Sequence, residues 1–300
     1  MISLSRLREA LESLYRTYNQ PAYITPDPLS AVLRFGSPEE REIVGIVAAS
    51  LAYGRAAQIE QSIDAALAPM ENAPRDFVMS ASTRDLRRFY SGFRHRWSTG
   101  EELAALLAGI RRTIGRYGSL RNCFAENDPS GAENTIRGLS SLVSNLGGPS
   151  SLLSDPAKNS ASKRLHLYLR WMVRNDAIDP GCWPGISASR LIIPLDTHMQ
   201  RIARGLAFTS RKGTDAATAL EVTEAFRRIC PEDPLRYDFV LTRLGIRADL
   251  QLQAFLAYCA LPAEGGSDVA RLVRRVSEDR ANCEDRLSKP ASTGAKRSAR

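Results

Sequence analysis

The sequence lacks the marks of membrane and secreted proteins. It contains no run of eighteen apolar residues, so no transmembrane helix is expected. Its N-terminal segment is too charged to resemble a secretory signal peptide. We therefore expect a soluble, cytoplasmic protein that does not bind a membrane.

Cysteine is also scarce and widely scattered along the chain. No two cysteines form a CxxC pair or a closely spaced cluster, which argues against a disulfide framework, a zinc site and an iron–sulfur cluster. We expect no metal and no cofactor. The five cysteines are Cys123, Cys182, Cys230, Cys259 and Cys283.

Positive charge is concentrated in a few segments rather than spread evenly. The chain has 300 residues and a formal charge of +8 at pH 7. Nine arginines lie between Arg84 and Arg121, five basic residues lie between Lys158 and Arg174, and five more follow from Arg286 to the end. Local basic segments favour a polyanionic partner, although net charge alone is weak evidence for one.

Helical spacing of apolar residues dominates the pattern, with no convincing strand alternation and no repeat. We expect about ten helices in an all-α protein of one large domain or two closely joined subdomains, covering residues 1–262. The apolar run from Ile43 to Tyr53 predicts a buried central helix that starts at Ser37-Pro38. Residues 263–300 are expected to be a charged, disordered tail with at most one exposed helix, at 268–279.

Two predicted helix starts, Lys163 and Asp196, are the strongest candidates for chemistry. Lys163 opens a helix whose basic residues fall on the side opposite its apolar face. That stripe is either a solvated helix face or a surface for phosphates. At the first turn, the helix dipole and nearby arginines disfavour the charged form of a lysine, which would make it a nucleophile. The stripe consists of Lys163, His166, Arg170 and Arg174.

Asp196 follows the apolar residues Ile192, Ile193 and Leu195 and precedes a segment with helical spacing of apolar residues up to Leu206, so it is expected at a helix N-cap. Most aspartates in that position only cap the helix. The apolar residues leading into Asp196 suggest instead a partly buried carboxylate beneath a pocket. Asp238 and Arg243, in a later predicted helix, are weaker candidates for the same cleft.

Aromatic and basic residues alternate between Arg84 and Trp97. Such a segment can bind single-stranded or flipped nucleic acid, or it can be an ordinary packed amphipathic segment. The sequence leaves both readings open.

Three blocks of the sequence resemble the helix-hairpin-helix DNA glycosylases. The segment LDTHMQRIARGL (195–206) resembles the one in which a catalytic aspartate opens a helix, and KRLHLYLRWM (163–172) resembles the lysine-bearing helix of the archaeal 8-oxoguanine glycosylase branch. EREIVGIVAASLAYGRAAQIEQSI (40–63) resembles the helix whose following loop probes the minor groove. These blocks, together with YDFVLTRLGI (237–246), also resemble a bacterial family of unknown function over nearly all of residues 1–262.

The resemblance implies a two-subdomain helical fold with a central cleft, acting on double-stranded DNA that carries a damaged base. Lys163 matches the Schiff-base lysine and Asp196 the aspartate that assists attack at the sugar carbon. Leu51 or Tyr53 would fill the gap left by a flipped base. The residues expected to contact DNA are Leu51, Tyr53, Arg55, Lys158, His166, Arg170, Arg174 and Arg201.

The sequence also departs from that superfamily. The hairpin signature LPGVGxKTA is replaced by residues 152–159, which lack both glycines, so Lys158 or the arginines would have to grip the DNA. Lys158 is in addition a rival nucleophile. Two hypotheses result. The first is a monomeric base-excision enzyme of the cytoplasm that associates with the nucleoid and whose expected substrate is an oxidised purine. The second is a non-catalytic nucleic-acid-binding protein on the same scaffold.

Overall fold

The computed structural model describes residues 3–129, 131–148, 151–246, 251–260 and 273. Within this part of the chain the protein is mostly helical, with only one two-stranded sheet, which confirms the all-α prediction. Among these residues, no helix combines the length and apolar character needed to cross a membrane. Apart from Val273, the predicted tail 263–300 and its helix at 268–279 lie outside the described residues.

Fourteen α-helices form in the described residues, more than the ten expected, because several short helices carry too few residues to show a period. The first seven are α1 (Leu4–Tyr18), α2 (Leu29–Val32), α3 (Pro38–Ser50), α4 (Ala56–Leu67), α5 (Pro74–Ser80), α6 (Thr83–Phe89) and α7 (Gly100–Tyr117). The others are α8 (Leu120–Glu126), α9 (Ile136–Leu146), α10 (Lys163–Val173), α11 (Thr197–Gly205), α12 (Ala216–Arg227), α13 (Asp238–Ile246) and α14 (Leu252–Ala260). Four 3-10 turns accompany them: η1 (Pro21–Tyr23), η2 (Ala68–Met70), η3 (Pro156–Lys158) and η4 (Ala188–Arg190).

The central helix α3 starts where the sequence predicts but ends earlier. Ser37 caps it, with its hydroxyl accepting a hydrogen bond from the backbone N–H of Glu40 at 3.2 Å. The predicted helix through Tyr53 is wrong for its last turn, since α3 ends at Ser50 and a tight turn follows, in which the N–H of Tyr53 bonds the carbonyl of Leu51. Gly54 then adopts a positive φ of 111°. Tyr53 therefore lies in the turn after α3 and not in the helix itself.

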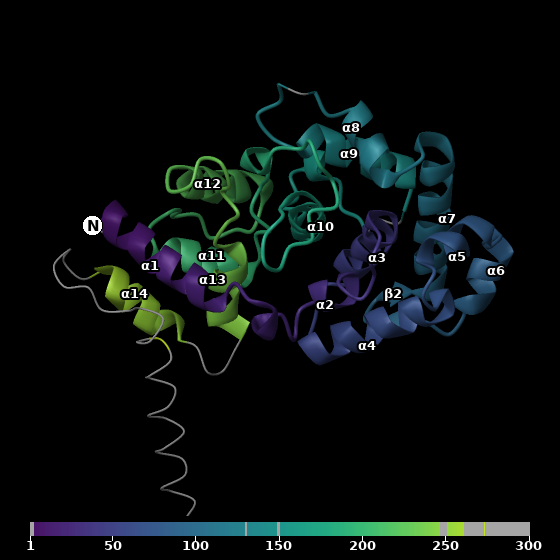
Figure 1. Cartoon of the computed structure of the whole chain (residues 1–300), viewed down its shortest axis with the longest axis horizontal. Coiled ribbons are helices and arrows are strands. Elements are labelled where there is room, and N and C mark those ends of the chain that lie inside the picture. Colours follow the sequence, from purple (N-terminus) through teal and green to yellow (C-terminus); the bar gives the residue numbers. More distant parts are fainter. Residues whose placement is uncertain (1–2, 130, 149–150, 247–250, 261–272, 274–300) are drawn as a thin grey trace, which may run out of the picture.

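Helices α3 and α10 pack together at the centre of the molecule (Figure 1). Their contact is close: a Cβ atom added at Gly45 would lie 3.0 Å from Met172 and 3.1 Å from Tyr168. The seven consecutive residues from Ile43 to Ala49 are all buried, as their apolar run predicts. This helix pair forms the core on which the remaining helices are arranged.

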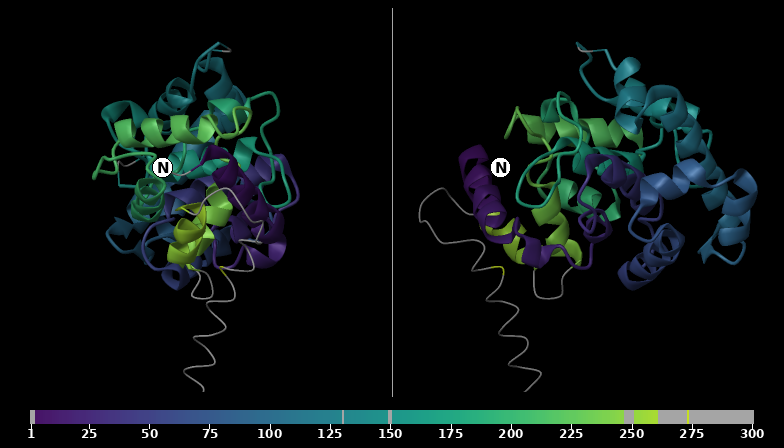
Figure 2. Two further views of the ribbon diagram at one scale, coloured as in Figure 1. Left: turned by 90° about the vertical axis from the view of Figure 1, so that its left-hand side faces the viewer. Right: turned by 45° about the vertical axis from the view of Figure 1, so that its right-hand side comes forward.

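The other helices form two groups on either side of this pair. Helices α4 to α7 lie toward one end, while α1 packs against α13 and α14 at the other (Figure 1). The right-hand view of Figure 2 keeps purple α1 beside yellow-green α14 and places the blue helices at the opposite end. This group therefore joins the first and the last helices of the described residues, which are far apart in sequence.

The described residues include one small strand pair that the sequence does not predict. Strand β1 (Arg94–His95) pairs antiparallel with β2 (Ser98–Thr99), so each strand is too short to show alternation. The buried ring of His95 holds this hairpin against the helices. Its Nδ1 lies 2.8 Å from the hydroxyl of Ser62 in α4, and its Nε2 lies 3.0 Å from the carbonyl of Tyr53.

Candidate functional site

Lys163 and Asp196 meet in space. The Lys163 Nζ atom lies 3.1 Å from Asp196 Oδ2, and the two side chains are 33% and 24% exposed. They are 33 positions apart in the sequence, and each stands at the start of a different helix, α10 and α11. The juxtaposition that the catalytic hypothesis requires is therefore present.

Asp196 caps α11, as predicted. Its Oδ1 accepts hydrogen bonds from the backbone N–H groups of His198 and Met199, at 2.9 and 2.8 Å, which leaves Oδ2 for Lys163. Burial alone would raise the pKa of Asp196, but the charge of Lys163 and the bond from Met199 outweigh it and hold that pKa below its usual value. The carboxylate is thus anionic at neutral pH.

The local chain explains why both side chains are held in place. Leu191 to Leu195 are all buried, so the segment leading into Asp196 is anchored in the core. Before α10, Ser162 adopts a left-handed conformation, and its hydroxyl donates to the carbonyl of Ser154 at 3.1 Å. Lys163 therefore begins its helix from a fixed turn.

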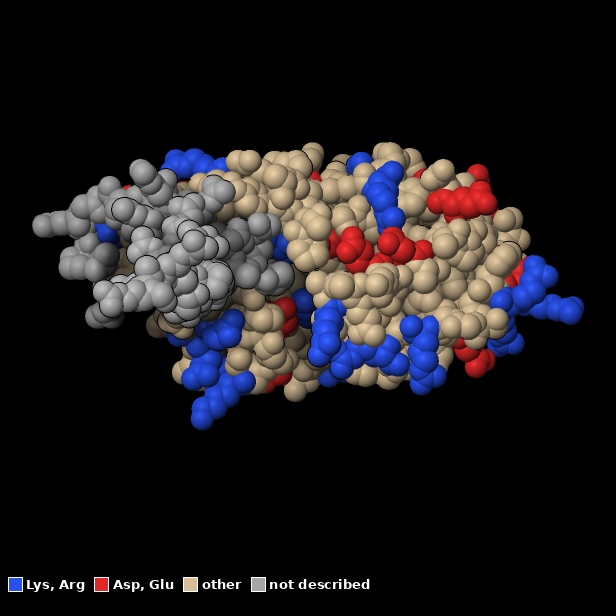
Figure 3. All heavy atoms as spheres, turned by 90° about the horizontal axis from the view of Figure 1, so that it is seen from below, with Lys and Arg blue, Asp and Glu red and all other residues tan. Residues whose placement is uncertain are grey.

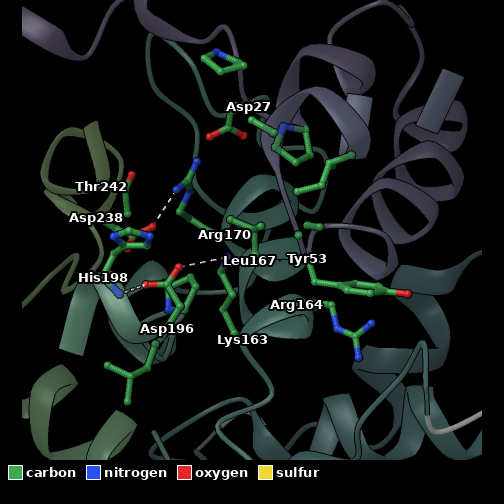
Figure 4. Close-up of a pocket in the computed structure, with 18 of the residues that line it drawn as sticks. Asp27, Tyr53, Lys163, Arg164, Leu167, Arg170, Asp196, His198, Asp238 and Thr242 are labelled. Atoms are coloured by element: carbon green, nitrogen blue, oxygen red, sulfur yellow. Dashed lines mark hydrogen bonds and ion pairs between the residues drawn. The ribbon is translucent and has the colours of Figure 1, made fainter. Parts of the chain in front are cut away.

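The pair lines a cavity of about 1060 Å³. Binding pockets for small ligands are typically about 300–1000 Å³, so this one can hold a nucleotide-sized group. Its walls come from the start of α10, the start of α11, α13, α4 and the turn after α3. In Figure 4, Asp196 and His198 lie on one side, Tyr53 and Arg164 on the other, and Lys163 points in between.

Asp238 also lines this cavity, in agreement with its prediction as a weaker candidate for the same cleft. It is 2% exposed; its Oδ2 accepts a hydrogen bond from Arg170 at 2.7 Å, while its Oδ1 has no partner. Burial raises the pKa of Asp238, whereas the pKa of Asp196 is lowered. One cavity therefore contains two carboxyl groups whose proton affinities have been driven apart, a common arrangement in active sites.

The predicted basic stripe on α10 is wrong for three of its four residues. His166, Arg170 and Arg174 are 3%, 1% and 3% exposed, because α10 lies in the middle of the molecule. They therefore form no solvent-facing stripe for phosphates, although Arg170 does line the cavity.

Both arginines of the stripe are instead paired with aspartates. Arg170 pairs with Asp179 at 3.1 Å as well as with Asp238, and Arg174 pairs with Asp233 at 3.0 Å and also with Asp179. These carboxylates raise the pKa of each guanidinium group despite its burial. Both guanidinium groups are therefore engaged by carboxyl groups inside the protein.

The two residues expected to fill a gap in DNA, Leu51 and Tyr53, lie in different surroundings. Leu51 is fully buried, so the prediction that it inserts into DNA is wrong. Tyr53 is half-buried and lines the cavity. Its hydroxyl lies 3.0 Å from the carbonyl of His95 and 2.8 Å from the hydroxyl of Ser98, which fixes the ring against the hairpin.

Arg55, Lys158 and Arg201 are exposed, as DNA-contacting residues must be. No carboxylate in the described residues pairs with any of them in an ion pair. Lys158, the rival nucleophile, ends the short turn η3 and is not among the residues that line the cavity. The geometry therefore distinguishes it from Lys163.

Arg164 also lines the cavity, although the sequence does not mark it as a site residue. It follows Lys163 in α10 and donates hydrogen bonds to the carbonyls of Ser50 and Ser151, both at 2.8 Å. Its guanidinium carbon lies 5.0 Å from the centre of the Tyr53 ring. A single arginine within a basic segment carries no signal of such a position, which depends on the turn after α3.

The described residues contain no group of three or more histidine, cysteine, aspartate or glutamate side chains that could hold a metal ion. Comparison with known proteins gave one family, described as "Protein of unknown function (DUF2400)", which matches residues 27–247. Neither the curated proteins nor the solved structures gave a match. The matched range includes both Lys163 and Asp196 and most of the chain, and the protein therefore belongs to the DUF2400 family.

Proposed function

We propose that this protein is a DNA base-excision enzyme, an N-glycosylase with an associated AP-lyase activity. The observation that carries the proposal is the Lys163–Asp196 pair, at 3.1 Å, in the wall of a cavity of about 1060 Å³. An amine beside an anionic carboxylate is the pair that nucleophilic attack on a sugar carbon requires. The cavity has room for a base that has been turned out of the duplex.

The chemistry would proceed in two stages. The glycosidic bond breaks and its electron pair leaves with the base, while the Asp196 carboxylate stabilises the positive charge that develops on the deoxyribose. The Lys163 Nζ atom, after giving its proton to Asp196, forms a bond to C1′. The adduct opens to a Schiff base when the C1′–O4′ bond breaks and a proton passes from the nitrogen to O4′. Loss of a C2′ proton then permits β-elimination, in which the C3′–O bond breaks, the phosphate leaves with its electron pair and the strand is cut.

The substrate and setting of the reaction follow from the resemblance to the archaeal glycosylase branch and from the exposed basic residues. We expect an oxidised purine such as 8-oxoguanine in double-stranded DNA, and a monomeric enzyme acting in the cytoplasm at the nucleoid. Arg55, Lys158 and Arg201 would hold phosphates. Because Arg170 and Arg174 are buried, they take no part in this grip.

Borohydride trapping tests the proposal. The protein is mixed with duplex DNA carrying 8-oxoguanine or an abasic site, and the borohydride reduces any Schiff base to a stable covalent adduct. We expect an adduct with the unaltered protein and with Lys158→Gln, and none with Lys163→Gln. The Asp196→Asn variant should form adduct much more slowly on the base-containing substrate, because it has lost its negative charge.

The alternative, a binding protein without chemistry, makes a different prediction for the same samples. Exposed basic residues such as Arg55 and Arg201 suffice for salt-sensitive DNA binding. That hypothesis predicts binding with no adduct and no released base across a panel of lesions. An adduct that persists in Lys163→Gln and disappears in Lys158→Gln would show that Lys158 is the nucleophile, and would refute the role proposed for Lys163.

A further inference from the structure

Trp97 is exposed in a way that the other tryptophans are not. It is 59% exposed, whereas Trp171 and Trp183 are 0% and 2% exposed. Trp97 lies in the turn that joins strands β1 and β2. Arg96, which precedes it in this turn, has a positive φ of 53°. A large aromatic side chain in water at a tight turn contributes little to the core, so its position calls for another explanation.

Trp97 continues a column of stacked groups that begins at the cavity. The Trp97 ring stacks on the ring of Tyr53, with the ring centres 4.9 Å apart and the ring planes inclined by 22°. The guanidinium group of Arg164 also lies over the Tyr53 ring. Arg164 is adjacent to Lys163 in α10. The column Arg164–Tyr53–Trp97 therefore connects the candidate nucleophile to the protein surface.

The column is held rigidly. The Tyr53 hydroxyl contacts the hairpin at His95 and Ser98, and the His95 ring is in turn bonded to Ser62 and to the Tyr53 carbonyl. Burial of the His95 ring lowers its pKa, so the ring is neutral at neutral pH. A rigid, pre-oriented aromatic surface binds a flat ligand with little loss of conformational entropy.

The charge around Trp97 favours a polyanion. Arg94 and Arg96 precede it in the hairpin. Arg55 follows Gly54, and a Cβ atom added at Gly54 would lie 3.1 Å from the Arg96 side chain. All three arginines are exposed, and within the described part of the chain none of them forms an ion pair with a carboxylate. Figure 3 shows lysine and arginine side chains gathered along one edge of the face that it presents.

We propose that Trp97, supported by Tyr53, is a stacking platform for an unpaired nucleobase of single-stranded nucleic acid. Arg55, Arg94 and Arg96 would contact the neighbouring phosphates. Every base has a flat face that can stack on an aromatic ring, and unpaired arginines attract the backbone, so this surface fits single strands of any sequence. The guanidinium of exposed Arg96, now 4.8 Å from the centre of the Trp97 ring, can move onto a phosphate when a base arrives. The inference goes beyond base excision, because it requires no bond to break.

Intrinsic fluorescence and anisotropy test this platform directly. All three tryptophans are described and only Trp97 is exposed, so quenching of tryptophan emission by oligothymidylate reports on that side chain. The Lys163→Gln protein is used throughout, which keeps the chemistry out of the measurement. We expect saturable quenching by a ten-nucleotide single strand, and weaker quenching by a blunt duplex of the same length.

Anisotropy of a labelled single strand measures the affinity of each variant. Trp97→Ala should weaken binding about 10- to 100-fold, as the loss of one stacked base does in other single-strand binders. Trp97→Phe, which keeps an aromatic face, should recover part of the loss. The matched control is Phe89→Ala, because Phe89 is 48% exposed and lies beside Arg88, yet it belongs to α6 and not to the column. Its affinity should not change.

Equal affinity in Trp97→Ala and in the unaltered protein would overturn the inference, and so would an equal loss in Phe89→Ala. The two proposals fail separately. A Trp97 effect without any trapped adduct leaves the platform standing and removes the chemistry. A trapped adduct without a Trp97 effect leaves the chemistry and removes the platform.

Discussion

Buried His166 makes the folded state sensitive to mild acid. The side chain is 3% exposed, and its Nδ1 atom has no hydrogen-bond partner. Burial lowers the pKa of His166 to about 4, compared with about 6.5 in an unfolded chain. As the pH falls below 6.5, the unfolded chain gains a proton here and the folded protein does not. Stability contributed by the neutral ring is therefore complete above pH 6.5 and is lost as the pH falls toward 4.

The size of this effect follows from the two pKa values. Each pH unit between them costs about 1.4 kcal/mol of unfolding free energy, so lowering the pH from 7 to 5 should cost about 2 kcal/mol through His166 alone. Other groups also titrate in this range. The contribution of His166 is therefore obtained as the difference between the unaltered protein and His166→Phe, which fills a similar volume and carries no ionisable group.

Urea unfolding at pH 7.0, 6.0 and 5.0 measures that difference. The unaltered protein should lose about 2 kcal/mol more than His166→Phe between pH 7 and pH 5. The control is His198→Asn, which alters an exposed histidine and should follow the unaltered protein. Parallel stability curves for His166→Phe and the unaltered protein would refute the reasoning, since they would mean that the folded protein accepts a proton at His166 without cost.

Two further predictions concern the packing of α10. Replacing Arg170 by methionine leaves Asp179 and Asp238 buried without their shared partner, and should lower the free energy of unfolding by about 3–5 kcal/mol in urea titrations; a change below about 1 kcal/mol would contradict the account of this cluster. Gly45→Ala adds a methyl group against side chains of α10 and should destabilise the protein by about 1–3 kcal/mol in thermal melts. Gly115 lies in α7 with open space around it, so Gly115→Ala should be neutral or should stabilise the protein by up to about 1 kcal/mol. Equal shifts for the two glycine variants would contradict the close packing of α3 on α10.

The parts of the fold that are coded locally were predictable. Ser37, followed by Pro38 and two glutamates, determines where α3 starts, and Asp196 caps α11 through backbone groups only two and three residues away. Such signals use neighbours in the sequence, and helix starts need little else. The two principal site residues both stand at starts of this kind.

The errors concern contacts between distant segments. Arg170 looks like part of a solvated stripe because its partner Asp238 lies 68 positions away, and no local pattern shows that the two meet. Leu51 and Tyr53 are equivalent candidates in the sequence, but one ends in the core and the other at the cavity, depending on a turn that Gly54 permits. Side-chain exposure at a helix end is a property of the assembled fold.

Burial of the arginines also changes how Lys163 would become a nucleophile. The sequence suggested that clustered arginines would disfavour the charged lysine, but Arg170 is already neutralised by Asp179 and Asp238. Another group must therefore accept the proton of Lys163, and Asp196 Oδ2 lies 3.1 Å from the Lys163 Nζ atom. Transfer between the two converts an ion pair into two neutral groups, which a dry site favours. A sugar that has expelled water from the cavity would therefore promote the transfer once the base has left and C1′ comes within reach of Nζ. Until then the ion pair would keep Asp196 negatively charged and the amine protonated.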